Sequence, residues 1–222
     1  SNLIQKSWPL KYIIKFVFFL IIILFIESIV IYFIPKNYYE ILIFVTYLLC
    51  LLFLLFFKKK YELPGFGLNL LYVKKLKIVP ISYIIIILIF IPIIPVNEWL
   101  VVNIFKTEIK LQDALLEIKN IDSTLRLTFY LLSVIIIVPI FEELIFRGIL
   151  FPKLVKRTGL ISGLTICSVI FAILHFHLPS LLPLFILSIV LCLLYWFTET
   201  MWTCIGLHIL FNGITVLAFM YS

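Results

Sequence analysis

The sequence predicts an all-α fold: a polytopic transmembrane helical bundle of about seven helices, within a range of six to eight, around a polar intramembrane cavity. Of the 222 residues, 64% are hydrophobic and only 13% are charged, whereas soluble domains average about 45–50% apolar and about 25% charged residues. The mean hydropathy is +1.26. The apolar residues also gather in repeated blocks of roughly 18 or more, the length that spans a bilayer.

Three apolar blocks predict the helices of the first part of the chain, at Lys11–Ile34, Glu40–Phe57 and Ile81–Leu100. Further apolar blocks follow the first one, which argues against a removable signal peptide, so we expect this helix to remain. Between the second and third helices, Leu63–Val79 mixes glycine, proline and lysine with apolar residues. This composition favours an interfacial connection or a short re-entrant piece over a span.

Asn103–Thr124 carries balanced charge, and its apolar residues show a partial helical periodicity. We therefore predict an amphipathic helix at the membrane surface. Four more helices are expected after it, at Leu125–Leu150 (interrupted by Pro139), Leu160–Phe176, Leu181–Phe197 and Trp202–Tyr221. Within one integral membrane domain, this division separates an N-terminal part, residues 1–124, from a four-helix catalytic core, residues 125–222.

The net charge of +7 could indicate a nucleic-acid partner, but lysine and arginine follow the apolar blocks directly, as in Lys58–Lys60 and Lys153–Arg157. Flanks of membrane helices explain this pattern, so the expected partner is the bilayer and not nucleic acid. The same clusters place the N-terminus in the cytoplasm of a multi-pass cell-membrane protein, which we expect in a bacterial plasma membrane. The four cysteines lie within apolar runs, and nothing in the sequence indicates an oligomeric state.

Three charges interrupt the apolar run in "FEELIFRGIL", Phe141–Leu150. Neighbouring helical residues point about 100° apart, so Glu142 and Glu143 must face different surroundings. Glu143 and Arg147 stand four residues apart with the acid first, the favourable order for a helical ion pair. Glu142 has no such local partner. This carboxylate is therefore available to activate water or to bind a cation.

Three histidines, His175, His177 and His208, are the other chemical candidates. "FAILH" places Phe171 on the helical face of His175, and "HILFN" places His208 and Asn212 on one face. His177 precedes "LPS" and is interpreted as an interfacial residue. Burying a polar group in a membrane costs free energy, so a buried polar group there usually has a function. We therefore expect Glu142, His175 and His208 to meet Asn212 at one pocket.

The residues that the known types of intramembrane protease require exclude several reaction mechanisms for this chain. The aspartyl type needs two intramembrane carboxylates, but Asp113 and Asp122 lie in the predicted surface segment. The chain contains neither the GxSx element of a serine protease nor an HExxH zinc motif. Sparse intramembrane charge also disfavours a metal or proton transporter, while a non-enzymatic immunity or partner-binding protein stays open.

Two chemistries remain for a peptidase. In the first, Glu142 and His175 activate water while His208 and Asn212 donate to the developing oxyanion. In the second, Glu142, His175 and His208 hold a zinc ion whose fourth ligand is water. We prefer the metal-free version.

Three motifs, in order and on separate apolar helices, resemble the CAAX prenyl protease and bacteriocin-processing (Abi) family. They are EExxxR at Glu142–Arg147, FxxxH at Phe171–His175 and HxxxN at His208–Asn212. The resemblance covers the chain from about Leu125 onward. It implies an eight-helix-like bundle with a conical cavity, and an intramembrane endopeptidase acting on a peptide or membrane-anchored substrate.

The catalytic roles that the resemblance implies fall on Glu142, His175, His208 and Asn212, with support from three further residues, Glu143, Arg147 and Phe171. Bacterial relatives are linked to peptide maturation or bacteriocin self-immunity. The resemblance therefore leaves self-immunity without proteolysis as the alternative function.

Overall fold

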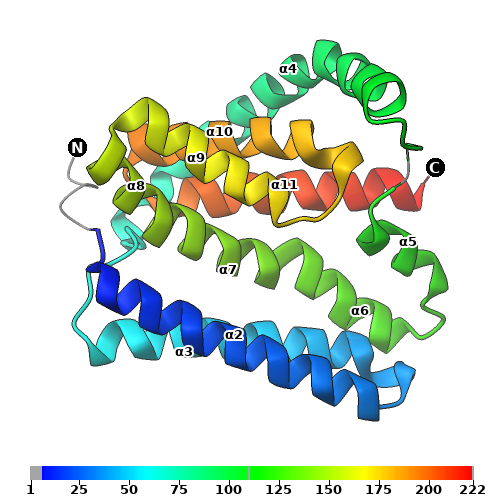
Figure 1. Ribbon diagram of the computed structural model, residues 1–222, viewed down its shortest axis with the longest axis horizontal. Coiled ribbons are helices and arrows are strands. Elements are labelled where there is room, and N and C mark those ends of the chain that lie inside the picture. Colours follow the sequence, from blue (N-terminus) through cyan, green and yellow to red (C-terminus); the bar gives the residue numbers. More distant parts are fainter. Residues whose placement is uncertain (1–6, 110, 222) are drawn as a thin grey trace.

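The computed structural model describes residues 7–109 and 111–221, and these residues contain helices and no strands (Figure 1). An all-α polytopic bundle is therefore confirmed. Six helices are long and apolar enough to cross a membrane, at Leu10–Phe33, Lys36–Lys60, Leu70–Ile104, Thr124–Thr158, Leu178–Thr198 and Met201–Met220 among the described residues.

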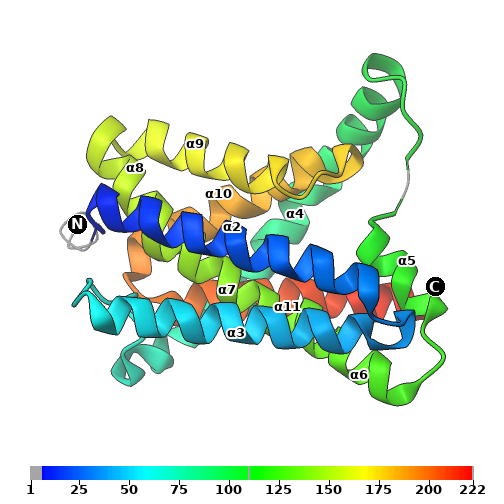
Figure 2. The same cartoon turned by 60° about the horizontal axis from the view of Figure 1, so that its bottom comes forward.

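The first pair of helices, α2 (Leu10–Phe33) and α3 (Tyr39–Lys60), lies along one side of the bundle (Figure 2). Helix α3 contacts both α2 and the long helix that begins at Thr124. On α2 only Phe16 is buried. A helix that is apolar on all sides and hardly buried by protein is suited to face lipid.

The predicted interfacial segment Leu63–Val79 contains a loop and then a 3₁₀ helix, η2 (Leu70–Ile78), which runs directly into α4 (Val79–Trp99). Helix α4 continues as a π-helical turn, η3 (Leu100–Ile104). The predicted surface helix is shorter than expected, because α5 covers only Asp113–Asn120.

The long helix from Thr124 to Thr158 is built from five segments: α6 (Thr124–Leu132), η4 (Ser133–Ile137), α7 (Val138–Ile145), η5 (Phe146–Leu150) and α8 (Phe151–Thr158). The segments η4 and η5 are π-helical turns. Each of them is followed by a proline, Pro139 or Pro152. Proline has no N–H for the α-helical ladder, and a widened turn accommodates that gap.

The last three helices are α9 (Leu160–Ile173), α10 (Leu181–Thr198, after the 3₁₀ turn η6 at Leu178–Ser180) and α11 (Met201–Met220). The prediction that one span runs through Leu160–Phe176 is wrong at its end, because α9 stops at Ile173 after 14 residues. At about 1.5 Å per residue such a helix is shorter than a bilayer core of about 30 Å.

The main apolar core joins both parts of the chain, from Trp8 and Phe16 to Phe171 and Leu207. A second cluster, formed by Ile118, Ile121, Tyr130, Val216 and Phe219, fixes α5 against α6 and α11. The Tyr130 hydroxyl also donates to the backbone oxygen of Ala114 at 2.8 Å. Helix α5 is thereby held over one end of the bundle.

Gly67 joins the loop after α3 to the turn between α10 and α11. Its carbonyl accepts from the Thr200 hydroxyl at 3.0 Å and from the Met201 N–H at 3.4 Å. The φ angle of Gly67 is +72°, and an added Cβ would lie 2.9 Å from the Glu199 carbonyl oxygen.

We expect Gly67→Ala to destabilise the protein by about 1–3 kcal/mol, because alanine is strained in this left-handed conformation and meets a fixed backbone atom. Gly65→Ala is the matched control, since its Cβ would come no closer than 3.9 Å to another residue. Thermal unfolding in detergent measures both variants. Equal midpoints for the two would show that the loop tolerates the change.

Candidate active site

The acidic pair lies on α7, between the two π-helical turns of the long helix. Glu143 is completely buried, whereas the side chain of Glu142 is 22% exposed. The expectation from helical geometry therefore holds: the two neighbours have different surroundings. π-Helical turns often occur at functional sites, where they change the direction of a side chain or free a backbone group.

Glu143 and Arg147 together connect the long helix to α10 and α11. Glu143 Oε1 accepts from Arg147 Nη1 at 2.8 Å, which confirms the predicted ion pair, and lies 2.7 Å from His208 Nδ1 on α11. Arg147 Nη2 donates in turn to Ser188 Oγ on α10 at 2.8 Å. All four side chains are buried. The network therefore sets the rotation of α7, α10 and α11 relative to one another.

The contact with Glu143 also determines the tautomer of His208. A carboxylate only accepts hydrogen bonds, so Nδ1 carries a proton. In the neutral ring, Nε2 then carries the lone pair, and this atom lies 3.7 Å from Glu142 Oε2. His208 thus stands between the two glutamates, with one ring nitrogen committed and the other directed to Glu142.

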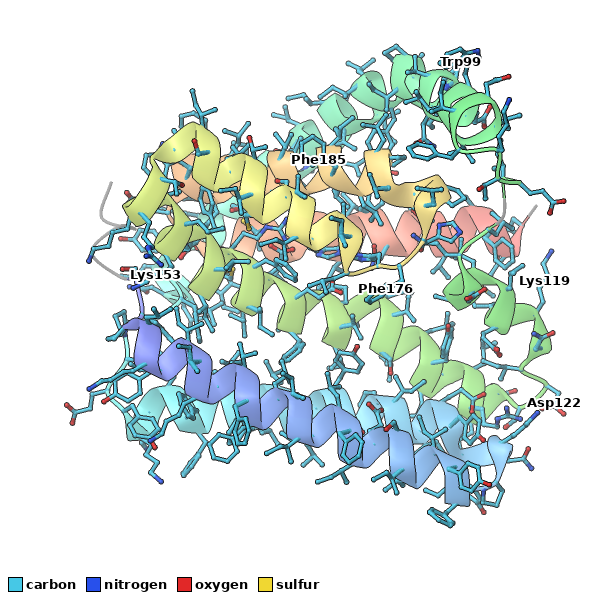
Figure 3. All side chains as sticks on the ribbon, viewed as in Figure 1. Trp99, Lys119, Asp122, Lys153, Phe176 and Phe185 are labelled. Atoms are coloured by element: carbon cyan, nitrogen blue, oxygen red, sulfur yellow. The ribbon has the colours of Figure 1, made fainter. Side chains whose placement is uncertain are left out.

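His175 follows the end of α9, in a turn whose next residue, Phe176, has a positive φ of 49°. Figure 3 labels Phe176 in this connection between α9 and α10. The Nδ1 of His175 lies 2.8 Å from the Phe171 carbonyl oxygen. Because that oxygen can only accept, Nδ1 carries the proton and Nε2 is left as a base. The early end of α9 therefore places this histidine on a turn and not on a helical face.

The buried ring of Phe171 packs against Arg147 of the charged network and against both imidazoles. Its centroid lies 4.7 Å from the His175 ring, 6.0 Å from the His208 ring and 4.7 Å from Arg147 Cζ. The aromatic face thus receives the guanidinium, and the two histidine rings pack against the same phenylalanine. This geometry gives a packing reason for the phenylalanine of the FxxxH motif.

Asn212 lies one turn after His208, and its Nδ2 donates to the Val134 carbonyl oxygen at 3.0 Å. That oxygen is available because the Val138 N–H bonds to Ser133 in the π-helical turn, and Pro139 has no N–H. Proline and the widened turn together orient the asparagine. Its second amide hydrogen and its Oδ1 remain for another partner.

One cavity of about 520 Å³ brings the four predicted catalytic residues together: Glu142, His175, His208 and Asn212. Its other walls come mostly from apolar residues of α4, the segment before α5, α5 itself and the start of α10, including Ile94, Ile109, Leu115 and Leu184. Glu143, Arg147 and Phe171 lie behind this wall. His177 is not among the lining residues and contacts Ser180 Oγ at 2.8 Å.

The zinc alternative needs Glu142, His175 and His208 close enough to share one ion. Within residues 7–109 and 111–221, no group of three His, Cys, Asp or Glu side chains is placed to hold a metal. Glu142 and His208 approach each other, and His175 shares their cavity without joining such a group.

Sequence reasoning did not find Ser188 or Val134. Ser188 had one signal, a hydroxyl within the apolar run "LFILSIVLCLL". The Val134 carbonyl oxygen had an indirect signal. Pro139, five residues later, has no N–H to donate to that oxygen in a π-helical turn. Both contacts join separate helices, and residue spacing along one helix cannot reveal a contact with another helix.

The family match covers the part of the chain that carries the four predicted catalytic residues. Residues 124–214 match the family described as "Type II CAAX prenyl endopeptidase Rce1-like". The Bacillus subtilis (strain 168) protein named "Putative membrane peptidase YdiL" is 37% identical over 82 residues, which are 37% of this chain and 34% of that protein. The match thus spans about a third of the relative's length. No solved structure matches the chain.

Proposed function

We propose, from the match of residues 124–214 to the Rce1-like family of type II CAAX prenyl endopeptidases, that this chain is an intramembrane endopeptidase that uses activated water. Its substrate is a peptide or a membrane-anchored protein, and its location is a cell membrane. The observation that carries the proposal is the convergence of Glu142, His175, His208 and Asn212 on one cavity.

In the proposed reaction, Glu142 takes a proton from water while His175 Nε2 accepts a hydrogen bond from the same molecule. The water oxygen attacks the carbonyl carbon of the scissile bond. The C–N bond then breaks, and the proton on Glu142 passes to the leaving amine. The apolar walls hold the substrate and limit the access of other water.

Asn212 and His208 face the oxyanion in this scheme. Asn212 donates its second amide hydrogen, because the first is held by Val134. His208 donates from Nε2 when its ring carries both protons, with Glu143 fixing the Nδ1 side and Glu142 close to the other. Oriented donors of this kind typically contribute about 10²–10³-fold in rate each. Metal content of the purified protein distinguishes this chemistry from the zinc alternative.

The test compares two histidine variants in detergent, with a quenched fluorescent library of short apolar peptides as the probe. We expect His175→Ala to lower kcat/KM by about 10²–10⁴-fold, because a positioned base is removed. His177→Ala is the matched control: it lies two residues away, outside the cavity lining, and is expected to retain activity.

Equal activity of the two variants would contradict the proposed roles. A folded protein without any hydrolysis would favour the alternative, a self-immunity or partner-binding membrane protein. That alternative predicts that cells expressing His175→Ala remain as protected as cells with the parent chain.

A further inference from the structure

The connection between α9 and α10, residues 174–180, carries His175 and has little regular structure. Helix α9 ends at Ile173, and only the short 3₁₀ turn η6 (Leu178–Ser180) precedes α10. Phe176, the residue after His175, is 87% exposed and has a positive φ of 49°. A non-glycine residue in this left-handed conformation is strained, so the connection needs contacts that hold it in place.

Most hydrogen bonds of this connection stay within it or return to the end of α9. The backbone N–H groups of residues 174–176 donate to carbonyl oxygens of α9, and His175 Nδ1 bonds to the Phe171 carbonyl oxygen, also on α9. Ser180 makes two hydrogen bonds to His177, one to its carbonyl oxygen and one to its ring. These bonds fix the local shape of the connection but not its position against the other walls of the cavity.

One side chain from a more distant helix reaches the connection. Asn97 on α4 donates from Nδ2 to the Pro179 carbonyl oxygen at 2.8 Å. Asn97 is only 8% exposed, and both residues line the catalytic cavity. In the described part of the chain, this is the one side-chain hydrogen bond that ties residues 174–180 to a helix other than α9 and α10. It fixes Pro179, four residues after His175, against the wall that α4 forms.

Asn97 is an unexpected residue at its place in α4. It lies in an apolar helix, two residues after Pro95, where a buried amide is stable only with a hydrogen-bond partner. An apolar side chain at this position would carry no such requirement. Asn97 also lies outside residues 124–214, so the family match assigns no role to it.

We propose that Asn97 is a positioning residue of the active site, whose bond to Pro179 holds the connection so that His175 keeps its place in the cavity. The inference rests on the proposed function, because it concerns the base that this function assigns to His175. A misplacement of about 1 Å can cost about 10²-fold in rate. The bond therefore acts on the chemical step and not on the binding of substrate.

Asn97→Leu removes the donor at similar side-chain volume. With the quenched peptide library in detergent, we expect kcat to fall by about 10–10²-fold while KM stays within about twofold. Asn103→Leu is the matched control and should keep the parent's kcat, since Asn103 Nδ2 donates to the Trp99 carbonyl oxygen of the same continuous helix at 3.0 Å. A raised KM with unchanged kcat would assign Asn97 to substrate contact and overturns the proposal.

A double-variant cycle tests whether Asn97 acts through His175. In His175→Ala no base is left to position, so the addition of Asn97→Leu should lower kcat by less than about twofold. A full further loss in this background overturns the proposal, because the two residues would then act independently.

Chemical modification reports the position of His175 without reference to activity. Diethyl pyrocarbonate reacts with an unprotonated imidazole nitrogen, and peptide mass spectrometry resolves the histidines. We expect the rate at His175 to rise by about threefold or more in Asn97→Leu, because a connection with one anchor fewer opens more often. Asn103→Leu should match the parent, and equal rates in all three proteins overturn the proposal. If the solubilised protein cleaves no peptide, the proposed function fails, whereas this rate still decides whether Asn97 holds His175.

Asn97→Asp is the second variant if gel filtration shows that Asn97→Leu does not fold. It keeps the shape of the side chain and replaces the amide donor by a carboxylate oxygen, so the same loss of kcat and the same rise in modification are expected. Failure of both variants to fold would make Asn97 a determinant of folding alone and overturns the proposal.

Discussion

Replacement of Glu142 by glutamine is expected to lower kcat by about 10²–10⁴-fold, which is the usual contribution of a general base. Glutamine keeps the size of the side chain but cannot take a proton from water. Glu142 is partly exposed in the cavity, and its Oε2 lies 3.7 Å from His208 Nε2, so the change removes a charge at the centre of the predicted site. Substrate binding should change much less than kcat, because the apolar walls remain.

Glu98→Gln is the matched control for this variant. Glu98 lines the same cavity and has the same carboxylate, but it lies on the wall formed by α4. Initial rates with the peptide library, measured on both variants in detergent, provide the comparison. Glu142→Gln within about threefold of the parent would exclude a general-base role. A similar loss in both variants would indicate a requirement for the cavity's total charge.

Replacement of Arg147 by methionine is expected to destabilise the protein by about 3–5 kcal/mol, because it leaves one member of a buried ion pair without its partner. Arg147 donates to both Glu143 and Ser188, and all three side chains are buried. Methionine fills similar volume but supplies no donor. The Glu143 carboxylate would then rely on His208 alone, and the contact with α10 would be lost.

Arg157→Met is the control, since Arg157 is exposed on α8 of the same long helix. Thermal unfolding in detergent and the monodisperse fraction on gel filtration measure both variants. An unchanged unfolding midpoint for Arg147→Met would show that the buried network contributes little to stability.

The double variant Glu143→Leu/Arg147→Met separates stability from activity. Removing both charges leaves no unpaired ion, so much of the lost stability should return, as it does for buried pairs replaced by apolar residues. Activity should stay low, because the Nδ1 of His208 loses the acceptor that fixes its ring. Recovery of both stability and activity would show that Glu143 does not position His208.

The sequence alone determined the features that depend on local spacing. Apolar blocks predicted the spans, because the length of a helix that crosses a bilayer follows directly from its rise per residue. The pair of Glu143 and Arg147 followed from a separation of four residues, and so did the shared face of His208 and Asn212. The three motifs also located the family, which the match over residues 124–214 supports.

Only the tertiary structure decided which helix faces meet. Helices that are apolar on every side carry no pattern that marks the inner face. Periodicity therefore could not predict the contact of His208 with Glu143 or the contact of Ser188 with Arg147. It also could not predict that α4 and α5 form walls of the cavity. The end of α9 at Ile173 and the free carbonyl of Val134 depend likewise on packing and on a widened turn. Side-chain direction within a helix is local, whereas the rotation of one helix against another is set by the whole core.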